Sequence, residues 1–292
     1  MRMRTVIVIA VTLLLAACGG SSEAGGKLDV VAAENVYGNI AAQIGGPHVS
    51  VTSILTSPSA DPHLFEPGTS SGLAVASAKV VLENGLGYDA FMTRLENAAP
   101  SKNRSVVTMA DVLGVHGKDA NPHLWYDVPR LDRIATAIAG AFTRADPPHA
   151  AAYRRGLHRF ERSLAPLRHE VATIRARFGG APVAYTEPVP GYLVAAAGLR
   201  NLAPDSFTRL IEEGTEPSPS AVAAMNSLVS DRRIRVLLYN SQAVSPITAR
   251  LRGAAEKAGI PVVPVSETLP PHLTFQQWQL DQARALAAAL AR

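Results

Sequence analysis

The most constraining feature of this sequence is a pair of strand–helix runs separated by a long segment without a strand pattern. The runs cover residues 28–146 and 179–292, and the segment between them, 147–178, keeps its apolar residues at helical spacing. Strands that alternate with helices favour a parallel or mostly parallel sheet covered by helices. We therefore predict an α/β protein with two α/β lobes, each built on a central sheet, joined by one long linker helix.

Short apolar runs predict the strands, and apolar residues at 3.6-residue spacing predict the helices. The predicted strands are 27–34, 49–55, 79–85, 105–111, 181–187, 234–240 and 260–266. The predicted helices are 35–46, 70–78, 87–99, 128–145, 191–199, 218–230, 245–259 and 274–290. Asp127 is a candidate N-cap of the fourth helix, and Ser218 followed by Pro219 predicts the start of the sixth.

The linker segment 147–178 is long enough to reach across both lobes. At 1.5 Å per residue, a helix of about 30 residues is roughly 45 Å long. Pro166 lies inside this segment, and proline removes one backbone hydrogen bond and clashes with the preceding turn. We therefore predict a kink or an interruption at this proline.

The first residues predict export. Residues 1–17 combine a basic start with a short apolar run and small residues, which is typical of a signal peptide. Cys18 is the only cysteine, so an internal disulfide is excluded, and residues 18–27 form a Gly/Ser-rich tether. The letters LAAC before and at Cys18 resemble a bacterial lipobox, which implies lipid attachment to Cys18 and anchoring to the outer face of the cell membrane. The alternative is an ordinary signal peptide that leaves Cys18 free in an exported or periplasmic protein.

The composition argues against a nucleic-acid partner. The net charge is only +4, and two of the arginines, Arg2 and Arg4, belong to the predicted leader. The sequence has no GxGxxG or GxxxxGK[ST] motif for binding a nucleotide phosphate.

Four loops that follow predicted strands each carry a potential metal ligand. The four residues are His63, His123, Glu187 and Glu267, two from each run. Ligands of open α/β sheets lie beyond the carboxyl ends of the strands, so two lobes would place these side chains on either side of a cleft. Taken alone, each residue favours an ordinary role: a surface position for a histidine, and a solvated carboxylate or a helix cap for a glutamate.

Both histidines directly follow a proline, in the stretches ADPHLFEP (60–67) and NPHLWYD (121–127). Proline fixes its own φ and restricts the residue before it, which holds the histidine in a rigid loop. A rigid loop lowers the entropy lost when the imidazole binds a metal. It would also suit a catalytic histidine, so the motif alone leaves both roles open.

These two stretches resemble the N-terminal metal motifs of the zinc/manganese substrate-binding lipoproteins of ABC transporters, the cluster A-I family. The resemblance covers nearly all of the mature chain. It implies that His63 and His123 are the two histidine ligands. It also places Glu187 where zinc relatives often have histidine and manganese relatives often have glutamate, and Glu267 where the family usually has aspartate.

The resemblance implies a carrier and not an enzyme. Zn²⁺ is the first expectation and Mn²⁺ the next, as a transported ligand that a monomeric protein delivers to an ABC permease. Asp61, Glu66 and Asp127 are expected either to hydrogen-bond the ligands or to cap turns, and His116 is a possible auxiliary ligand. The alternatives are a surface adhesin on the same fold or a metal-dependent hydrolase, although the sequence lacks an HExxH motif.

Overall fold

The structure is a computed structural model that describes residues 26–58 and 65–292. The predicted signal peptide, Cys18 and most of the tether lie outside the described residues. Asp61 and His63 lie outside them as well.

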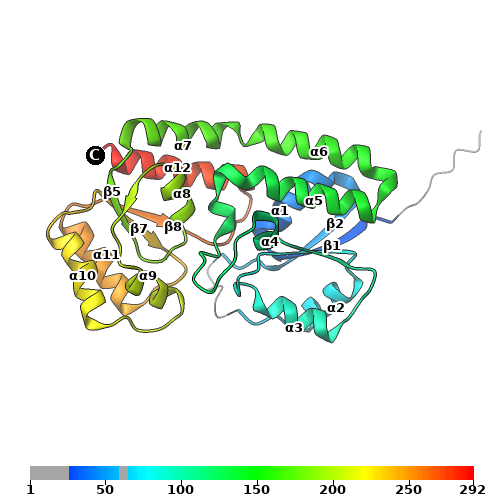
Figure 1. Cartoon of the computed structure of the whole chain (residues 1–292), viewed down its shortest axis with the longest axis horizontal. Coiled ribbons are helices and arrows are strands. Elements are labelled where there is room, and N and C mark those ends of the chain that lie inside the picture. The colour runs from blue at the N-terminus through cyan, green and yellow to red at the C-terminus, as the bar shows by residue number, and fades with distance from the viewer. Residues whose placement is uncertain (1–25, 59–64) are drawn as a thin grey trace, which may run out of the picture.

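The N-terminal lobe contains a sheet of four parallel strands in the order β2-β1-β3-β4. Its strands are β1 (Leu28–Glu34), β2 (Val49–Leu55), β3 (Val80–Glu83) and β4 (Ser105–Thr108). Its α-helices are α1 (Asn35–Gly45), α2 (Thr69–Ser77), α3 (Ala90–Ala98), α4 (Met109–Leu113) and α5 (Leu131–Ala145). In Figure 1, α2 and α3 lie on one side of this sheet, and α1 and α5 lie on the other. The sheet is therefore covered on both faces, as the apolar strand sequences predict.

The C-terminal lobe repeats this arrangement with a second parallel sheet in the order β6-β5-β7-β8. Its strands are β5 (Pro182–Tyr185), β6 (Arg200–Asn201), β7 (Val236–Asn240) and β8 (Val262–Val265). Its α-helices are α8 (Gly191–Ala196), α9 (Asp205–Glu212), α10 (Pro219–Ser230), α11 (Pro246–Lys257) and α12 (Phe275–Leu290). The structure thus confirms two α/β lobes with central parallel sheets.

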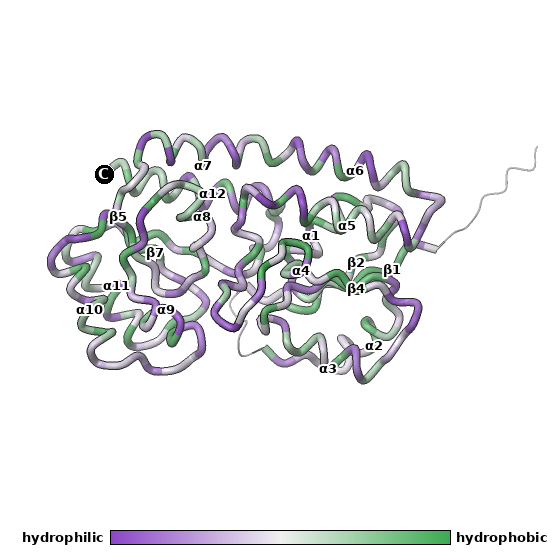
Figure 2. The backbone as a smooth tube through the Cα atoms, viewed as in Figure 1, coloured by the Kyte–Doolittle hydropathy of each residue, from purple (hydrophilic) through white to green (hydrophobic). Residues whose placement is uncertain are grey.

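The connection between the lobes is made of two helices in succession, α6 (Ala150–Ser163) and α7 (Ala165–Phe178). They follow one another along the same side of both lobes (Figure 1). Pro166 lies in the first turn of α7, where a missing backbone N–H does no harm. The interruption predicted at this proline is therefore confirmed, and the break itself falls at Leu164. Figure 2 shows many hydrophilic residues along α6, consistent with its solvent-facing side.

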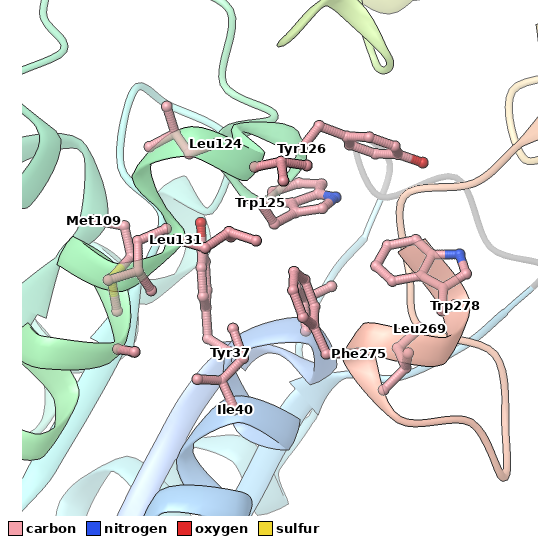
Figure 3. Packing of buried hydrophobic residues seen from close by; sticks show 14 of the residues in the cluster. Tyr37, Ile40, Met109, Leu124, Trp125, Tyr126, Leu131, Leu269, Phe275 and Trp278 are labelled. Carbon is pink, nitrogen blue, oxygen red and sulfur yellow. The ribbon is translucent and has the colours of Figure 1, made fainter. Parts of the chain in front are cut away.

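The largest buried apolar cluster extends through both lobes. It joins Tyr37 and Ile40 of α1 to Trp125 and Tyr126, and further to Phe275 and Trp278 of α12 (Figure 3). Trp125 is fully buried, and its ring makes edge contacts with the rings of Tyr37 and Tyr88. Because side chains in such a core are close-packed, the two lobes are held together by more than their connecting helices.

Local boundaries differ from the sequence predictions at a few positions. Ser218 caps α10 by accepting a hydrogen bond from the backbone N–H of Ala221, as predicted. The prediction of Asp127 as an N-cap is wrong, because α5 begins only at Leu131 after a short 3₁₀ turn. The carboxylate of Asp127 instead accepts a hydrogen bond from Arg130, three residues ahead. Helices α4 and α9 and the two-residue strand β6 are additional elements.

Helix α6 packs on α1 at Gly156, and this contact gives a stability prediction. A Cβ atom at Gly156 would collide with the backbone carbonyl of Ile44 in α1. We expect Gly156→Ala to lower the free energy of unfolding by about 1–3 kcal/mol, because the helices must move apart. The control is Gly253→Ala in α11, where a Cβ meets no atom within 4 Å. There the higher helix propensity of alanine should raise the free energy of unfolding by up to about 1 kcal/mol. Denaturant unfolding measures both values, and equal effects would contradict the packing account.

Candidate metal site between the lobes

The candidate site lies where the carboxyl ends of the two sheets meet. In each sheet the strand order reverses next to the first strand of the lobe, between β1 and β3 and between β5 and β7. Such reversals leave a crevice beyond the strand ends, where α/β proteins bind ligands. Glu187 follows β5 by two residues, Asn240 ends β7, and Glu267 follows β8 by two residues. His123 lies in the loop after α4 of the other lobe.

His123 is fully buried and its imidazole has a defined orientation. The Nδ2 of Asn121 donates to the carbonyl of Pro188 at 2.7 Å, so the Oδ1 of Asn121 faces the histidine. This oxygen lies 2.8 Å from the Nδ1 of His123 and 3.0 Å from its backbone nitrogen, and it accepts from both. The Nδ1 atom therefore carries a proton, and Nε2 is the ring nitrogen that faces the other lobe.

The carboxylates of Glu187 and Glu267 are brought together by a single amide group. The Nδ2 of Asn240 donates to the Oε2 of Glu187 and to the Oε1 of Glu267, each at 2.7 Å. The exposed fractions are 1 % for Glu187, 0 % for Glu267 and 1 % for Asn240. Two carboxylates in so dry a place repel one another, and burial of a charge is costly unless it is compensated. A positive charge placed beside these two carboxylates would compensate them.

The contact between the lobes places a histidine nitrogen beside a carboxylate oxygen. The Nε2 of His123 lies 3.1 Å from the Oε2 of Glu267. Two ligand atoms about 2.0–2.2 Å from a tetrahedral zinc ion are roughly 3.4 Å apart. The observed separation therefore needs only a small adjustment for both atoms to bind the same ion. Tyr88 donates its hydroxyl proton to the same Oε2 of Glu267 at 2.9 Å; burial and the nearby Glu267 charge raise the pKa of Tyr88, which keeps it protonated.

Glu212 is a further carboxylate near the site that the sequence predictions omit. It ends α9, and its Oε1 lies 3.7 Å from the Nδ1 of His123. The sequence holds a signal for this helix, because Phe207, Leu210 and Ile211 follow helical spacing.

The other predicted residues lie in different surroundings. Glu66 and His116 are exposed on the surface. Asp127 pairs with Arg130, while Asn121 occupies the position beside the imidazole. Within residues 26–58 and 65–292, no three His, Cys, Asp or Glu side chains are grouped closely enough to hold a metal ion. The described part of the predicted site is thus His123 with Glu267, and Glu187 joined to Glu267 through Asn240.

A buried imidazole and two buried carboxylates lie between the two α/β lobes, and these are side chains of the kinds that bind divalent cations. The chain belongs to the family described as zinc-uptake complex component A, periplasmic, whose model matches residues 30–289. This match confirms the family resemblance of the Pro-His stretches. The family comprises substrate-binding proteins of ABC transporters, which bind metal ions and deliver them to a permease and are not enzymes.

Curated relatives agree with this family. The chain is 28 % identical over 267 residues to the manganese-binding lipoprotein MntA of Bacillus subtilis, covering 86 % of this chain and 84 % of the relative. It is 24 % identical over 248 residues to the manganese ABC transporter substrate-binding lipoprotein ScaA of Streptococcus gordonii, covering 78 % and 77 %. The relatives are thus lipoproteins or periplasmic binding proteins. Within the described part of this chain, no helix has the length and apolar character needed to cross a membrane.

Solved structures share the fold. The periplasmic zinc-binding protein TroA of Treponema pallidum superposes with a TM-score of 0.75 at 18 % identity, covering 91 % of this chain and all of TroA. The binding protein FpvC of Pseudomonas aeruginosa, solved with Ni²⁺, has a TM-score of 0.76 at 19 % identity, covering 91 % and 97 %. The two-lobe architecture is therefore that of known metal-binding proteins.

Proposed function

We propose that this protein binds a divalent metal ion outside the cytoplasm and delivers it to the membrane subunit of an ABC transporter. The observation that carries the proposal is the 3.1 Å contact between the Nε2 of His123 and the Oε2 of Glu267, from opposite lobes. The contact is buried and lies next to a second carboxylate, Glu187. A cation between the lobes would replace this contact by two metal bonds.

The proposed ligands are His63, His123, Glu187 and Glu267, with His63 supplied by the segment outside the described residues. Two neutral imidazoles and two carboxylates balance the charge of a divalent ion. Zinc accepts four such ligands in tetrahedral geometry. Manganese prefers more oxygen, which two bidentate carboxylates could provide. We place Zn²⁺ first and Mn²⁺ second as the transported ion.

Release of the ion is proposed to occur by small shifts of loops. The segment after Glu267 is bound to the N-terminal lobe: the backbone N–H of Leu269 donates to Asn35 and its carbonyl accepts from Asn35. The hydroxyl of Thr268 donates to the carbonyl of Ser57, which lies in the other lobe. Together with the core that both lobes share, these bonds oppose a wide hinge opening.

A hydrolase is not supported by the local structure or by the family. The letters GTSSG at residues 68–72 have the spacing of a hydrolase nucleophile motif, which requires the serine on a turn between a strand and a helix. Ser70 instead lies inside the first turn of α2 and is exposed.

We further propose the predicted anchoring of the chain through a lipid on Cys18, a monomeric state, and lobes of 28–146 and 179–292 separated by 147–178. Relatives named as lipoproteins support the anchor. The two connecting helices and the separate sheets support the division of the chain.

Metal titration of the mature, metal-stripped protein tests this function. We expect one-to-one binding of Zn²⁺ and of Mn²⁺ in separate calorimetric titrations, with zinc the tighter ion because zinc exceeds manganese at most nitrogen and oxygen sites. Binding should also raise the unfolding free energy, by about 2.7 kcal/mol when free metal is 100 times the dissociation constant. If neither ion binds, the transport function is wrong, and a surface adhesin becomes the better account.

A further inference from the structure

Beneath the proposed metal site lies a buried pair of acidic side chains that the site itself does not use. Glu34 ends β1, and Asp89 precedes α3. Only 1 % of Glu34 and 4 % of Asp89 is exposed. Both residues stand at the carboxyl ends of the neighbouring strands β1 and β3, where the order of the sheet reverses.

The hydrogen bonding of this pair is incomplete unless a proton lies between the two groups. Neither carboxyl oxygen of Glu34 receives a hydrogen bond from an N–H or O–H group of another described residue. Continuing the register of β1 and β3 by two residues brings Glu34 opposite Asn84, and the backbone N–H of Asn84 donates to Asp89, so the two carboxyl groups lie side by side. Two ionised carboxylates are acceptors only, so a bond between them requires that one is protonated. A shared proton also removes one of two adjacent buried negative charges.

Among the described residues, the charged and titratable groups that act on the pair are acids and tyrosines. The titratable groups that face the pair are Glu83 of β3, Glu96 of α3, Tyr37 of α1 and Tyr88 of the intervening turn. None of these described groups is positive at neutral pH. Burial, with the Glu83 charge adding to it, raises the pKa of Asp89 to about 6. Burial and the nearby Asp89 raise the pKa of Glu34 well above its usual range.

Asp89 also holds the turn that follows β3. Its carboxyl oxygens accept from the backbone N–H of Asn84 at 2.5 Å and of Gly85 at 2.9 Å. The turn is strained, because Gly85, Leu86 and Gly87 all have positive φ, and Leu86 is not glycine. Such a backbone persists only where its surroundings fix it, and Asp89 is one of the groups that do so.

The Asn84–Tyr88 turn is hydrogen-bonded to the candidate site in both lobes of the protein. Asn84 donates through its side-chain Nδ2 to the carbonyl of Pro122, the residue before His123, at 2.8 Å. Tyr88, at the far end of the turn, donates to Glu267. The acidic pair is therefore linked through one short turn to a histidine of one lobe and a carboxylate of the other.

We propose that Glu34 and Asp89 share one proton in the folded protein at neutral pH. This protonated pair holds the Asn84–Tyr88 turn in the position that metal binding requires. Glu34 and Asp89 are positioning residues in this scheme and do not touch the metal. The positioning part rests on the proposed function, whereas the shared proton does not.

Infrared spectroscopy of the metal-free, full-length mature chain tests the shared proton directly. At pH 7 we expect the C=O stretch of a protonated carboxyl group in the parent, its loss in Glu34→Gln, and its shift in Asp89→Asn, where the buried Glu34 keeps its proton but loses the carboxylate that accepts it. The control is Glu213→Gln, which changes an exposed glutamate in the same way and should leave the band unchanged. A parent without the band, or a band that neither substitution changes, would overturn the proposal.

Thermal unfolding as a function of pH tests the same pair, because a shared proton predicts the direction in which stability changes with pH. A carboxyl group whose pKa is raised by folding stabilises the protein fully below its unfolded pKa, and this contribution is lost as pH rises through the folded pKa. The pH range of this loss begins at about pH 4, the pKa of a carboxyl group in the unfolded chain. For Asp89 it extends through about 6, the pKa of this residue in the folded protein. The melting temperature of Glu34→Gln minus that of the parent should therefore increase from pH 4.5 to pH 8. A difference that is constant with pH would contradict the shared proton.

Metal affinity then tests the positioning role. Glutamine at position 34 supplies an N–H donor in place of the shared proton, so Glu34→Gln should bind Zn²⁺ within a few-fold of the parent at pH 7. Glu34→Ala removes that donor and should weaken binding by about 10–100-fold, as for other residues that support a ligand. Equal affinity of the parent and Glu34→Ala would refute the positioning role. If the parent itself binds no metal but shows the infrared band, the proposed function fails and the shared proton stands.

Discussion

Replacement of both Glu187 and Glu267 by alanine is expected to weaken zinc binding by more than about 100-fold. Removal of a residue that only supports a ligand costs about 10–100-fold in affinity, and this variant removes two proposed ligands with their charges. The remaining imidazoles would hold the ion without any compensating negative charge from the C-terminal lobe. Competition titration of the metal-stripped protein against a chelator of known affinity measures the change.

The matched control exchanges two exposed glutamates of the same lobe, Glu213 and Glu216, for alanine. It removes the same number of charges from the protein but none from the buried site, so its affinity should stay within a few-fold of the parent. Tight binding that survives in the Glu187→Ala, Glu267→Ala variant would mean that the assignment of ligands in the C-terminal lobe is wrong.

The substitution Asn240→Asp is expected to lower the free energy of unfolding of the metal-free protein by roughly 3–6 kcal/mol. Asn240 donates two hydrogen bonds to carboxylates, and each such bond to a charged group is worth about 1.5–3 kcal/mol. The substitution keeps the shape of the side chain but removes both donors and adds a third carboxylate to a buried site. Bound zinc should restore part of the loss, because the ion attracts all three groups.

Denaturant unfolding with and without zinc measures this effect. Asn226→Asp on the exposed side of α10 is the control, since it makes the same chemical change in water, and we expect a change within about 0.5 kcal/mol. Comparable stability of Asn240→Asp and Asn226→Asp in the absence of metal would show that Asn240 does not hold the two carboxylates together.

The order of the main elements can be predicted from the sequence because the relevant patterns are local. The apolar run of Val236–Asn240 and the helical spacing of Leu131–Ala145 each depend on neighbours along the chain. Helix α9 is harder to predict, because it has only eight residues and lies near the lower limit of helix length in globular proteins. The prediction for Asp127 is wrong for a related reason. Its side chain could either cap the start of the helix or bind Arg130, and the sequence does not show that it binds Arg130.

Likewise, only some residues of the candidate site can be predicted from the sequence. A histidine after a proline and a carboxylate after a strand are visible in the sequence, and His123, Glu187 and Glu267 are therefore accessible to sequence reasoning. Asn240 and Tyr88 are not, because an asparagine at a strand end and a tyrosine in a turn have many roles. Their importance arises only when the lobes meet and Glu267 comes within hydrogen-bonding distance of both.

The most direct test of the metal-carrier account is a crystal structure of the zinc-loaded mature protein, with anomalous scattering measured at the zinc absorption edge. The account predicts one strong anomalous peak between the lobes, bonded to the Nε2 of His123 and to carboxylate oxygens of Glu187 and Glu267, with His63 as the fourth ligand. A peak elsewhere on the protein, or a zinc ion between the lobes that is not bonded to either carboxylate, would contradict it.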